Sequence, residues 1–217
     1  MGLIDFPDPS HASDGDFIAF GGSLNTDNLL RAYRRGIFPW PVDGLPLVWF
    51  SPEKRAILEF NDLHVPRRLS RVRRRTNVRC TIDQNFEAVI AHCAGVRRNG
   101  EDGTWITPEM LRAYSELHSL GNAHSVEVWD REHLVGGLYG VDVDGCFSGE
   151  SMFHLHPNAS KLALLHLIDH LQARGLDWID IQVLTPHMTA LGAKEIDRDE
   201  FLFKLKATRA RQLKIFD

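Results

Sequence analysis

A strand-like segment in the last quarter of the chain, residues 178–183, carries two polar side chains between apolar ones. Because side chains alternate along a strand, Asp180 and Gln182 are predicted to share one face, while Ile179 and Ile181 share the other. A buried carboxylate or amide costs free energy unless it is hydrogen-bonded. The pair indicates either a structural polar network or a site in which Asp180 orients Gln182 toward a substrate, and both interpretations stay open.

A second carboxylate, Glu150, follows Gly149 in an aromatic, methionine-containing stretch over residues 147–153. A glycine inside a strand often marks a bulge or the close approach of a ligand. Glu150 could therefore bind a cationic group or an amine. The alternative is an ordinary glutamate on an edge strand that faces water.

Basic side chains are concentrated in one short segment of an acidic chain. The chain has 217 residues, 25 Lys plus Arg against 29 Asp plus Glu, and a formal net charge of -4, so a polyanion site must be a local patch. Arginine binds phosphate through its planar fork, although such a cluster is equally often a solvated helix face. The residues are Arg67, Arg68, Arg71, Arg73, Arg74 and Arg75, and Lys204, Lys206, Arg209, Arg211 and Lys214 could extend them.

Several other kinds of site are disfavoured. Cys80, Cys93 and Cys146 are too widely spaced for a disulfide framework or a C-x-x-C site, which favours a reducing, cytoplasmic setting. His166 and His170 have helical spacing but lack an H-E-x-x-H pattern, so no metal site is expected. The sequence has no G-x-S-x-G, Walker or G-x-G-x-x-G motif. A serine nucleophile and nucleotide or dinucleotide chemistry are accordingly not predicted.

The segments that must position these side chains divide the chain in two. Residues 1–55 are rich in proline, glycine and aromatics, with one predicted helix that begins at Thr26 or Asp27 and ends before Gly36. Residues 56–217 alternate strands and helices. The first part of this region predicts a strand through Phe60, a helix from Pro66, a strand over 78–82, a helix capped by Asp83, a polar loop over 97–103 and a helix from Thr107 to Gly121.

The remaining segments predict the centre of a sheet. Residues 124–153 read as three antiparallel strands, and Asp144-Gly145 is a strong hairpin signal. A largely apolar helix over 159–173, capped by Asn158, precedes the strand over 178–183. Short helices follow from Thr185 and from Asp197 or Asp199. The order predicts an α/β (α+β) protein with a mixed sheet, in which a small N-terminal domain over 1–55 precedes a larger domain over 56–217.

Seven ordered blocks of unusual composition are similar to the bacterial leucyl/phenylalanyl-tRNA protein transferases. The resemblance runs through nearly the whole chain and is far more specific than one short motif. The blocks are Gly36-Ile37-Phe38-Pro39-Trp40, Trp49-Phe50-Ser51-Pro52, Gly103-Thr104-Trp105-Ile106-Thr107, His124-Ser125-Val126-Glu127-Val128-Trp129, Gly149-Glu150-Ser151-Met152-Phe153, Asn158-Ala159-Ser160-Lys161 and Asp180-Ile181-Gln182.

The resemblance implies a GNAT-like acyltransferase domain behind a small N-terminal domain. It implies transfer of Leu or Phe, and less readily Met, from aminoacyl-tRNA to the α-amino group of proteins that begin with Arg or Lys, which creates an N-end-rule degradation signal. No cofactor is expected. Acetyltransferases of this fold hold CoA on a glycine-rich loop, whereas residues 154–159 contain no glycine, which argues against CoA.

The resemblance also implies roles for individual residues. Tyr33, Trp40, Trp105 and Tyr114 are expected to stack on the terminal adenosine of the tRNA. The aminoacyl side chain is expected in an apolar pocket that separates Leu from Phe poorly. Leu138 and Leu167 replace a Met and a Phe that are familiar in the family, so the preference between Leu and Phe stays open. The pocket residues are Leu138, Phe147, Met152, Leu167, Ile179 and Ile181.

For the chemistry, the resemblance points to Asp180, Gln182 and Glu150. An ester is already activated, so positioning and proton removal suffice without a covalent enzyme intermediate. Asp180 is the favoured base, Gln182 orients the amine or polarises the carbonyl, and Glu150 attracts the cationic acceptor. The arginine cluster is expected to hold the tRNA acceptor stem. The rival hypotheses are a CoA-dependent small-molecule acyltransferase and a non-catalytic module that binds tRNA or peptide.

Overall fold

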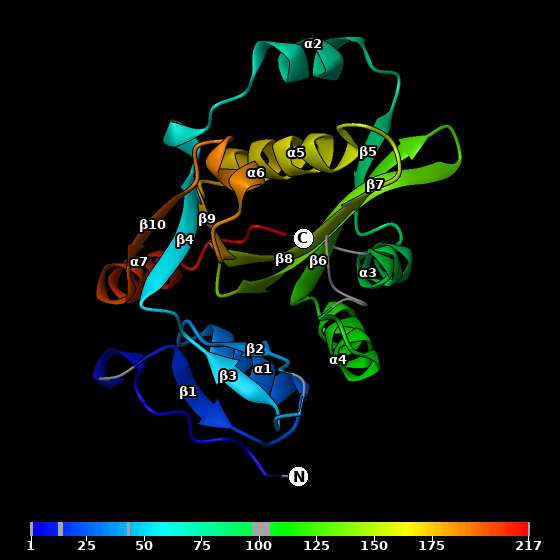
Figure 1. Ribbon diagram of the computed structural model, residues 1–217. Coiled ribbons are helices and arrows are strands. Elements are labelled where there is room, and N and C mark those ends of the chain that lie inside the picture. Colours follow the sequence, from blue (N-terminus) through cyan, green and yellow to red (C-terminus); the bar gives the residue numbers. More distant parts are fainter. Residues whose placement is uncertain (1, 13–14, 43, 97–104, 217) are drawn as a thin grey trace.

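The computed structural model describes residues 2–12, 15–42, 44–96 and 105–216, and these form two sheets with helices around them. The predicted polar loop over 97–103 lies outside the described residues. The smaller sheet, at the bottom of Figure 1, has the strand order β1-β3-β2 and packs with helix α1. Its elements are β1 Phe17–Phe20, α1 Thr26–Tyr33, β2 Phe38–Trp40 and β3 Val48–Phe50.

The larger sheet has seven strands in the order β10-β4-β9-β8-β7-β6-β5. β8 and β9 run parallel and the other neighbouring strands are antiparallel, which confirms the predicted mixed sheet. The bounds are β4 Lys54–Glu59, β5 Arg79–Ile82, β6 Ala123–Asp130, β7 His133–Val143, β8 Cys146–His154, β9 Trp178–Gln182 and β10 Lys194–Asp197.

The helices cover both faces of the larger sheet, so that each face has its own core. Neighbouring side chains on β7 point to opposite faces: Leu138 packs with the core under α5, and Tyr139 packs with the core formed by α1, α3 and α4. α2 lies beyond α5, at the end of the molecule farthest from the N-terminal sheet (Figure 1). The bounds are η1 Pro9–His11, η2 Phe60–Asp62, α2 Arg67–Arg75, α3 Phe86–Gly95, α4 Pro108–Ser119, α5 Ala159–Ala173, α6 Pro186–Thr189 and α7 Arg198–Ala210.

Side-chain caps begin several of these helices, and the caps of three helices differ from the prediction, including α5, which Asn158 begins without a side-chain capping hydrogen bond. Thr107 caps α4 by accepting a hydrogen bond from the backbone N–H of Met110, as predicted. Asn25 caps α1 in place of Thr26 or Asp27, and Asn85 caps α3 in place of Asp83. The carboxylate of Asp83 instead accepts a hydrogen bond from the backbone N–H of Ser125 at 2.7 Å, which ties it to β6.

Two parts of the fold differ from the predicted elements. The three strands of the N-terminal sheet, each three or four residues long, were not predicted. β10 was not predicted either. β4 begins at Lys54 and already belongs to the larger sheet, so a division near residue 55 remains a proposal. The likeness to GNAT acyltransferases likewise remains a prediction. Within the described residues, no helix is both long and apolar enough to cross a bilayer.

Candidate active site

The two strands that carry the predicted polar residues separate in the middle of the larger sheet. β8 and β9 are paired through Ser148 and Asp180. Farther along β8, Gly149 pairs with Gly140 and Ser151 pairs with Tyr139, which leaves Glu150 as the extra residue of a bulge. A bulge redirects the side chain of the unpaired residue. The predicted irregularity at Gly149 is therefore confirmed, and it directs Glu150 toward the split between the strands.

β9 contains a bulge of its own, which changes the predicted alternation of side chains. Asp180 pairs with Ile57 and Gln182 pairs with Ala56, so Ile181 is the extra residue. Gln182 then adopts a left-handed backbone with φ of 63°. The prediction that Asp180 and Gln182 share a face opposite Ile179 and Ile181 was wrong, because Gln182 lines the same pocket as both isoleucines and Asp180 does not.

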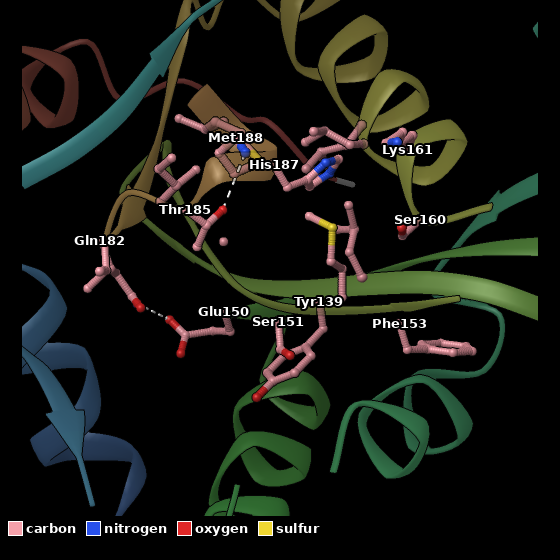
Figure 2. Close-up of a pocket in the computed structure, with 18 of the residues that line it drawn as sticks. Tyr139, Glu150, Ser151, Phe153, Ser160, Lys161, Gln182, Thr185, His187 and Met188 are labelled. Carbon is pink, nitrogen blue, oxygen red and sulfur yellow. Dashed lines mark hydrogen bonds between the residues drawn. The ribbon is translucent and has the colours of Figure 1, made fainter. Parts of the chain in front are cut away.

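A cavity of about 560 Å³ occupies this split, between the sheet, α5 and α6 (Figure 2). The structure brings all six residues of the predicted apolar pocket to its wall. They come from β7, β8, β9 and α5, and are Leu138, Phe147, Met152, Leu167, Ile179 and Ile181. Met188 of α6 and Leu164 of α5 extend this apolar lining. The site can therefore enclose an apolar group of roughly side-chain size.

Glu150 is the centre of a hydrogen-bonded cluster at one end of the cavity. Gln182 Nε2 donates to Glu150 Oε1 at 2.6 Å, as Figure 2 shows. Tyr33 Oη donates to the same oxygen at 2.7 Å, and Tyr114 Oη donates to Oε2 at 3.2 Å. The alternative that Glu150 is a solvated edge-strand glutamate is thus excluded, because all of these partners are protein groups and β8 is an interior strand.

The pKa of Glu150 is raised to about 7, chiefly by burial and with a smaller contribution from the charge of Asp180, against the lowering effect of the hydrogen bonds from Tyr33 and Gln182. Burial also raises the pKa values of the Tyr33 and Tyr114 hydroxyls well above 10, so both stay protonated donors. A carboxyl with a pKa near neutrality can take up and release a proton under ordinary conditions.

Asp180 lies behind the cavity in a buried ion pair. Arg55 Nε and Nη2 donate to its two carboxylate oxygens at 2.8 and 2.7 Å, and both side chains are at most 2% exposed. Ser148 Oγ donates to Asp180 Oδ2 at 2.9 Å, and the backbone N–H of Gln182 donates to Oδ1 at 2.9 Å. Of the two interpretations of this residue, the structural polar network therefore fits Asp180. Its carboxylate also holds the backbone of Gln182.

The four aromatic residues expected around the adenosine fall into two pairs. Trp40 and Trp105 line the cavity with parallel rings, 5.8 Å between centroids and 6° between planes. Tyr33 and Tyr114 do not line it. The two residues are 4% and 0% exposed, and their hydroxyls are hydrogen-bonded to each other at 2.6 Å and to Glu150. Stacking of adenine on these two tyrosines is therefore incompatible with the structure, because no ring face is open.

The sequence places this chain among known enzymes. The family model of leucyl/phenylalanyl-tRNA protein transferase matches residues 57–206, and the model of that family's N-terminal domain matches residues 22–53. The chain belongs to this transferase family. Membership makes the protein an enzyme of the aminoacyltransferase class, and the cavity described above is its candidate active site.

Curated leucyl/phenylalanyl-tRNA–protein transferases are similar over almost the full length of the chain. Relatives from Anaeromyxobacter sp. and Pseudoalteromonas atlantica are 48% and 47% identical, over 93% and 94% of this chain and 86% and 87% of their own. One from Maridesulfovibrio salexigens is 48% identical over 91% of this chain and 82% of its own. A crystal structure of a functionally unknown conserved protein from Staphylococcus epidermidis has a TM-score of only 0.42 and 11% identity, over 66% of this chain and 57% of that one.

The predicted arginine cluster of this transferase forms the exposed surface of α2. Arg73 forms an ion pair with Asp169 of α5, which links α2 to α5. The basic residues of α7 do not extend the cluster, because α7 lies at the other side of the molecule (Figure 1). Lys204 and Arg209 of α7 are paired with Glu59 and Asp144 instead.

Sequence reasoning missed two parts of the transferase site. Arg55 was overlooked because it precedes an apolar strand with no motif around it, although a buried aspartate requires a cationic or hydrogen-bonding partner. Lys161 and His187 were also overlooked as cavity residues. Among the histidines whose spacing could suggest a metal site, His154 lines the cavity, whereas His166 and His170 do not, and His170 is bonded to the backbone of Ile215. Among the described residues, no group of three or more His, Cys, Asp or Glu side chains is arranged to hold a metal ion.

Proposed function

We propose that this transferase moves a Leu or Phe residue, and less readily Met, from aminoacyl-tRNA to the α-amino group of a protein that begins with Arg or Lys. The observation that carries the proposal is a buried carboxyl, Glu150, at the rim of an apolar cavity that also presents the rings of Trp40 and Trp105. The resulting N-terminal residue would mark the acceptor protein for proteolysis. The reaction would take place in the cytoplasm, where aminoacyl-tRNA is used.

The aminoacyl side chain would enter the apolar part of the cavity. Leu138, Met152 and Leu167 offer a wall without fixed charge, which suits an apolar side chain that is not branched at Cβ and rejects charged ones through desolvation. The terminal adenine would lie against Trp40 and Trp105, which are half-buried and line the cavity, because indole rings give sequence-tolerant stacking. Tyr33 and Tyr114 would act on Glu150 and not on the adenine.

The proposed chemistry is direct aminolysis of the ester, with Glu150 as the base. The acceptor nitrogen forms a bond to the carbonyl carbon, and Glu150 takes a proton from that nitrogen. Collapse of the tetrahedral intermediate breaks the bond to the ribose 3′ oxygen, and the proton passes from Glu150 to that oxygen. A pKa of about 7 suits both steps, because the acceptor α-amine has an ordinary pKa of roughly 8.

The other two residues would position the reacting groups. Gln182 donates to Glu150 and lies at the cavity wall, where its amide can orient the amine or polarise the ester carbonyl. Asp180, favoured as the base from the sequence, is bound by the Arg55 fork and by the backbone of Gln182 and does not line the cavity, so it is not placed to meet the acceptor amine. Its proposed role is to hold Gln182 in place.

The test is a direct assay of product. Purified protein is mixed with Leu-tRNA carrying labelled leucine and with peptides that begin with Arg, Lys, Ala or Glu, and the peptides are analysed by mass spectrometry. We expect N-terminal extension of the Arg and Lys peptides without added CoA. Binding of Leu-tRNA without extension of any peptide would instead support a non-catalytic module, and extension only with acyl-CoA would support the other rival.

A further inference from the structure

The end of the cavity opposite Glu150 has a different chemistry from the rest of the site. Figure 2 shows Ser160 and Lys161, from the first turn of α5, at the far side of the cavity from Gln182 and Glu150. His187 of α6 lies beside the same end. Among the described residues that line the cavity, Glu150 is the sole carboxylate, and it is already bound by its own partners. Nothing in the described lining neutralises the charge of Lys161.

The start of α5 also presents unused backbone donors. Asn158 begins the helix in a left-handed conformation, and its side chain makes no capping hydrogen bond. The backbone N–H of Ala159 donates to the carbonyl of His156, and that of Leu162 donates to Asn158. The N–H groups of Ser160 and Lys161 between them have no acceptor among the described residues. Uncapped N–H groups and the positive end of a helix favour an anion.

A side-chain donor independent of the helix is directed to the same place. His187 Nε2 is buried and has no hydrogen-bond partner among the described residues, an arrangement that costs free energy unless a ligand supplies the partner. Burial lowers the pKa of this imidazole, and the nearby Lys161 and His154 lower it further. The neutral ring can still donate a hydrogen bond from Nε2 without adding a second buried charge.

We propose that Ser160, Lys161 and His187 form a phosphate subsite, which takes the 5′ phosphodiester of the terminal adenosine of the substrate. This inference rests on the proposed function, because it adds a binding contact to the same substrate. A phosphodiester fits better than a carboxylate, since the donors come from different directions and match several oxygens around a tetrahedral centre. The subsite would anchor the tRNA end independently of the α2 arginines.

The experiment compares two small donors that differ only in the phosphate. One is 3′-O-leucyl-adenosine, and the other carries a 5′ phosphate in addition. We expect the wild-type protein to use the phosphorylated donor with kcat/KM at least about tenfold higher, as a charge-assisted hydrogen bond provides. Lys161→Met should abolish that preference, so that this variant uses the two donors with equal kcat/KM. Ser160→Ala should reduce the preference in part.

The matched control is Lys206→Met, which removes one exposed positive charge from α7 and should keep the full preference. Equal use of both donors by the wild type, or an undiminished preference in Lys161→Met, would overturn the subsite. If neither donor gave product, the proposed function would fail. In that case, calorimetry would still test the subsite. The wild type should bind adenosine 5′-phosphate more tightly than adenosine, and Lys161→Met should bind the two with equal affinity.

Discussion

Two carboxylates within the same sheet are placed in opposite environments. Asp180 is fixed in a forked ion pair with Arg55, whose guanidinium lies between the rings of Phe38 and Phe201 at 4.6 and 4.4 Å. Glu150 has only neutral donors around it, and burial raises its pKa to about 7. Environments that separate two carboxyl groups in this way assign them different functions. In the proposed mechanism, Asp180 in its ion pair holds the structure of the site and Glu150 moves the proton.

The first prediction concerns Glu150→Gln. A base must be ionised to act, so the Glu150-dependent part of the rate should be present above pH 7 and lost as the pH falls through about 7. We expect the variant to lose roughly 10²-fold or more in kcat at pH 8, within the usual range for a general base. Its rate should also depend less on pH than that of the wild type with the same acceptor peptide, because the titration of the amine is common to both.

The measurement is the pH profile of single-turnover transfer between pH 5.5 and 9. Circular dichroism of Glu150→Gln at each pH serves as the control for folding. A variant with wild-type rates at all pH values would exclude Glu150 as the base. Asp180→Asn provides a second comparison. It removes the negative charge that raises the pKa of Glu150, so the pH profile of transfer should shift to lower pH.

The second prediction concerns the ion pair itself. Arg55→Met should destabilise the protein by about 3 to 5 kcal/mol, because it leaves Asp180 charged, buried and without its cationic partner. The double variant Arg55→Met with Asp180→Asn should recover part of this loss, since no uncompensated charge remains. Urea unfolding of the two single variants and the double variant gives the coupling energy. Strictly additive changes would mean that the pair does not act as a unit.

At the scale of elements, the sequence predicted most of the helices and the central strands. Capping residues such as Thr107 and Thr185 and the Asp144-Gly145 hairpin are local signals, which is why they were readable. The strands β1, β2, β3 and β10 are too short to show periodicity. The site was only partly predictable, because contacts such as Tyr33 to Glu150 join residues 117 positions apart. In addition, bulges in β8 and β9 change the alternation of side chains from which the faces of Asp180 and Gln182 were predicted.

The third prediction concerns the bulge on β8. A Cβ at Gly140 would overlap the ring of Phe147 and the carbonyl oxygen of Ser148, so Gly140→Ala should cost at least about 1 to 3 kcal/mol and displace Glu150. Gly149→Ala is the matched control on the paired strand, since its Cβ would meet only the Asp180 carbonyl oxygen at 3.7 Å. Thermal unfolding should separate the two variants. Equal melting temperatures would show that the hairpin tolerates side chains at both positions.

At the scale of the whole molecule, the candidate active site contains residues from both sheets. Trp40 comes from the smaller sheet, and Tyr33 of α1 reaches Glu150 on β8. Arg55 Nη1 donates to the carbonyl of Gly36 at 3.0 Å, so the ion pair behind the site also contacts the N-terminal part. The left-handed Gly36 leaves no room for a side chain beside Phe201. The N-terminal segment therefore completes the larger domain's site.

The last prediction concerns the arginines of α2 at the opposite end of the molecule. Arg71, Arg74 and Arg75 are exposed, and among the described residues none of the three is in an ion pair, so they can meet a phosphate backbone. Replacing all three with Gln should raise the apparent KM for aminoacyl-tRNA. Each lost phosphate contact should also reduce the slope of log affinity against log salt by about 0.7 to 0.9.

The control for this prediction is Lys206→Gln, which removes an exposed charge from α7, at the other side of the molecule. That variant should keep the wild-type salt slope, because a polyanion bound by α2 and the cavity does not reach α7. Leucyl-adenosine is too short to reach α2, so the triple arginine variant should use it as well as the wild type does. A triple variant with an unchanged slope on tRNA would show that the cluster is only a solvated helix face. Loss of activity on both donors would instead point to damage in the cavity.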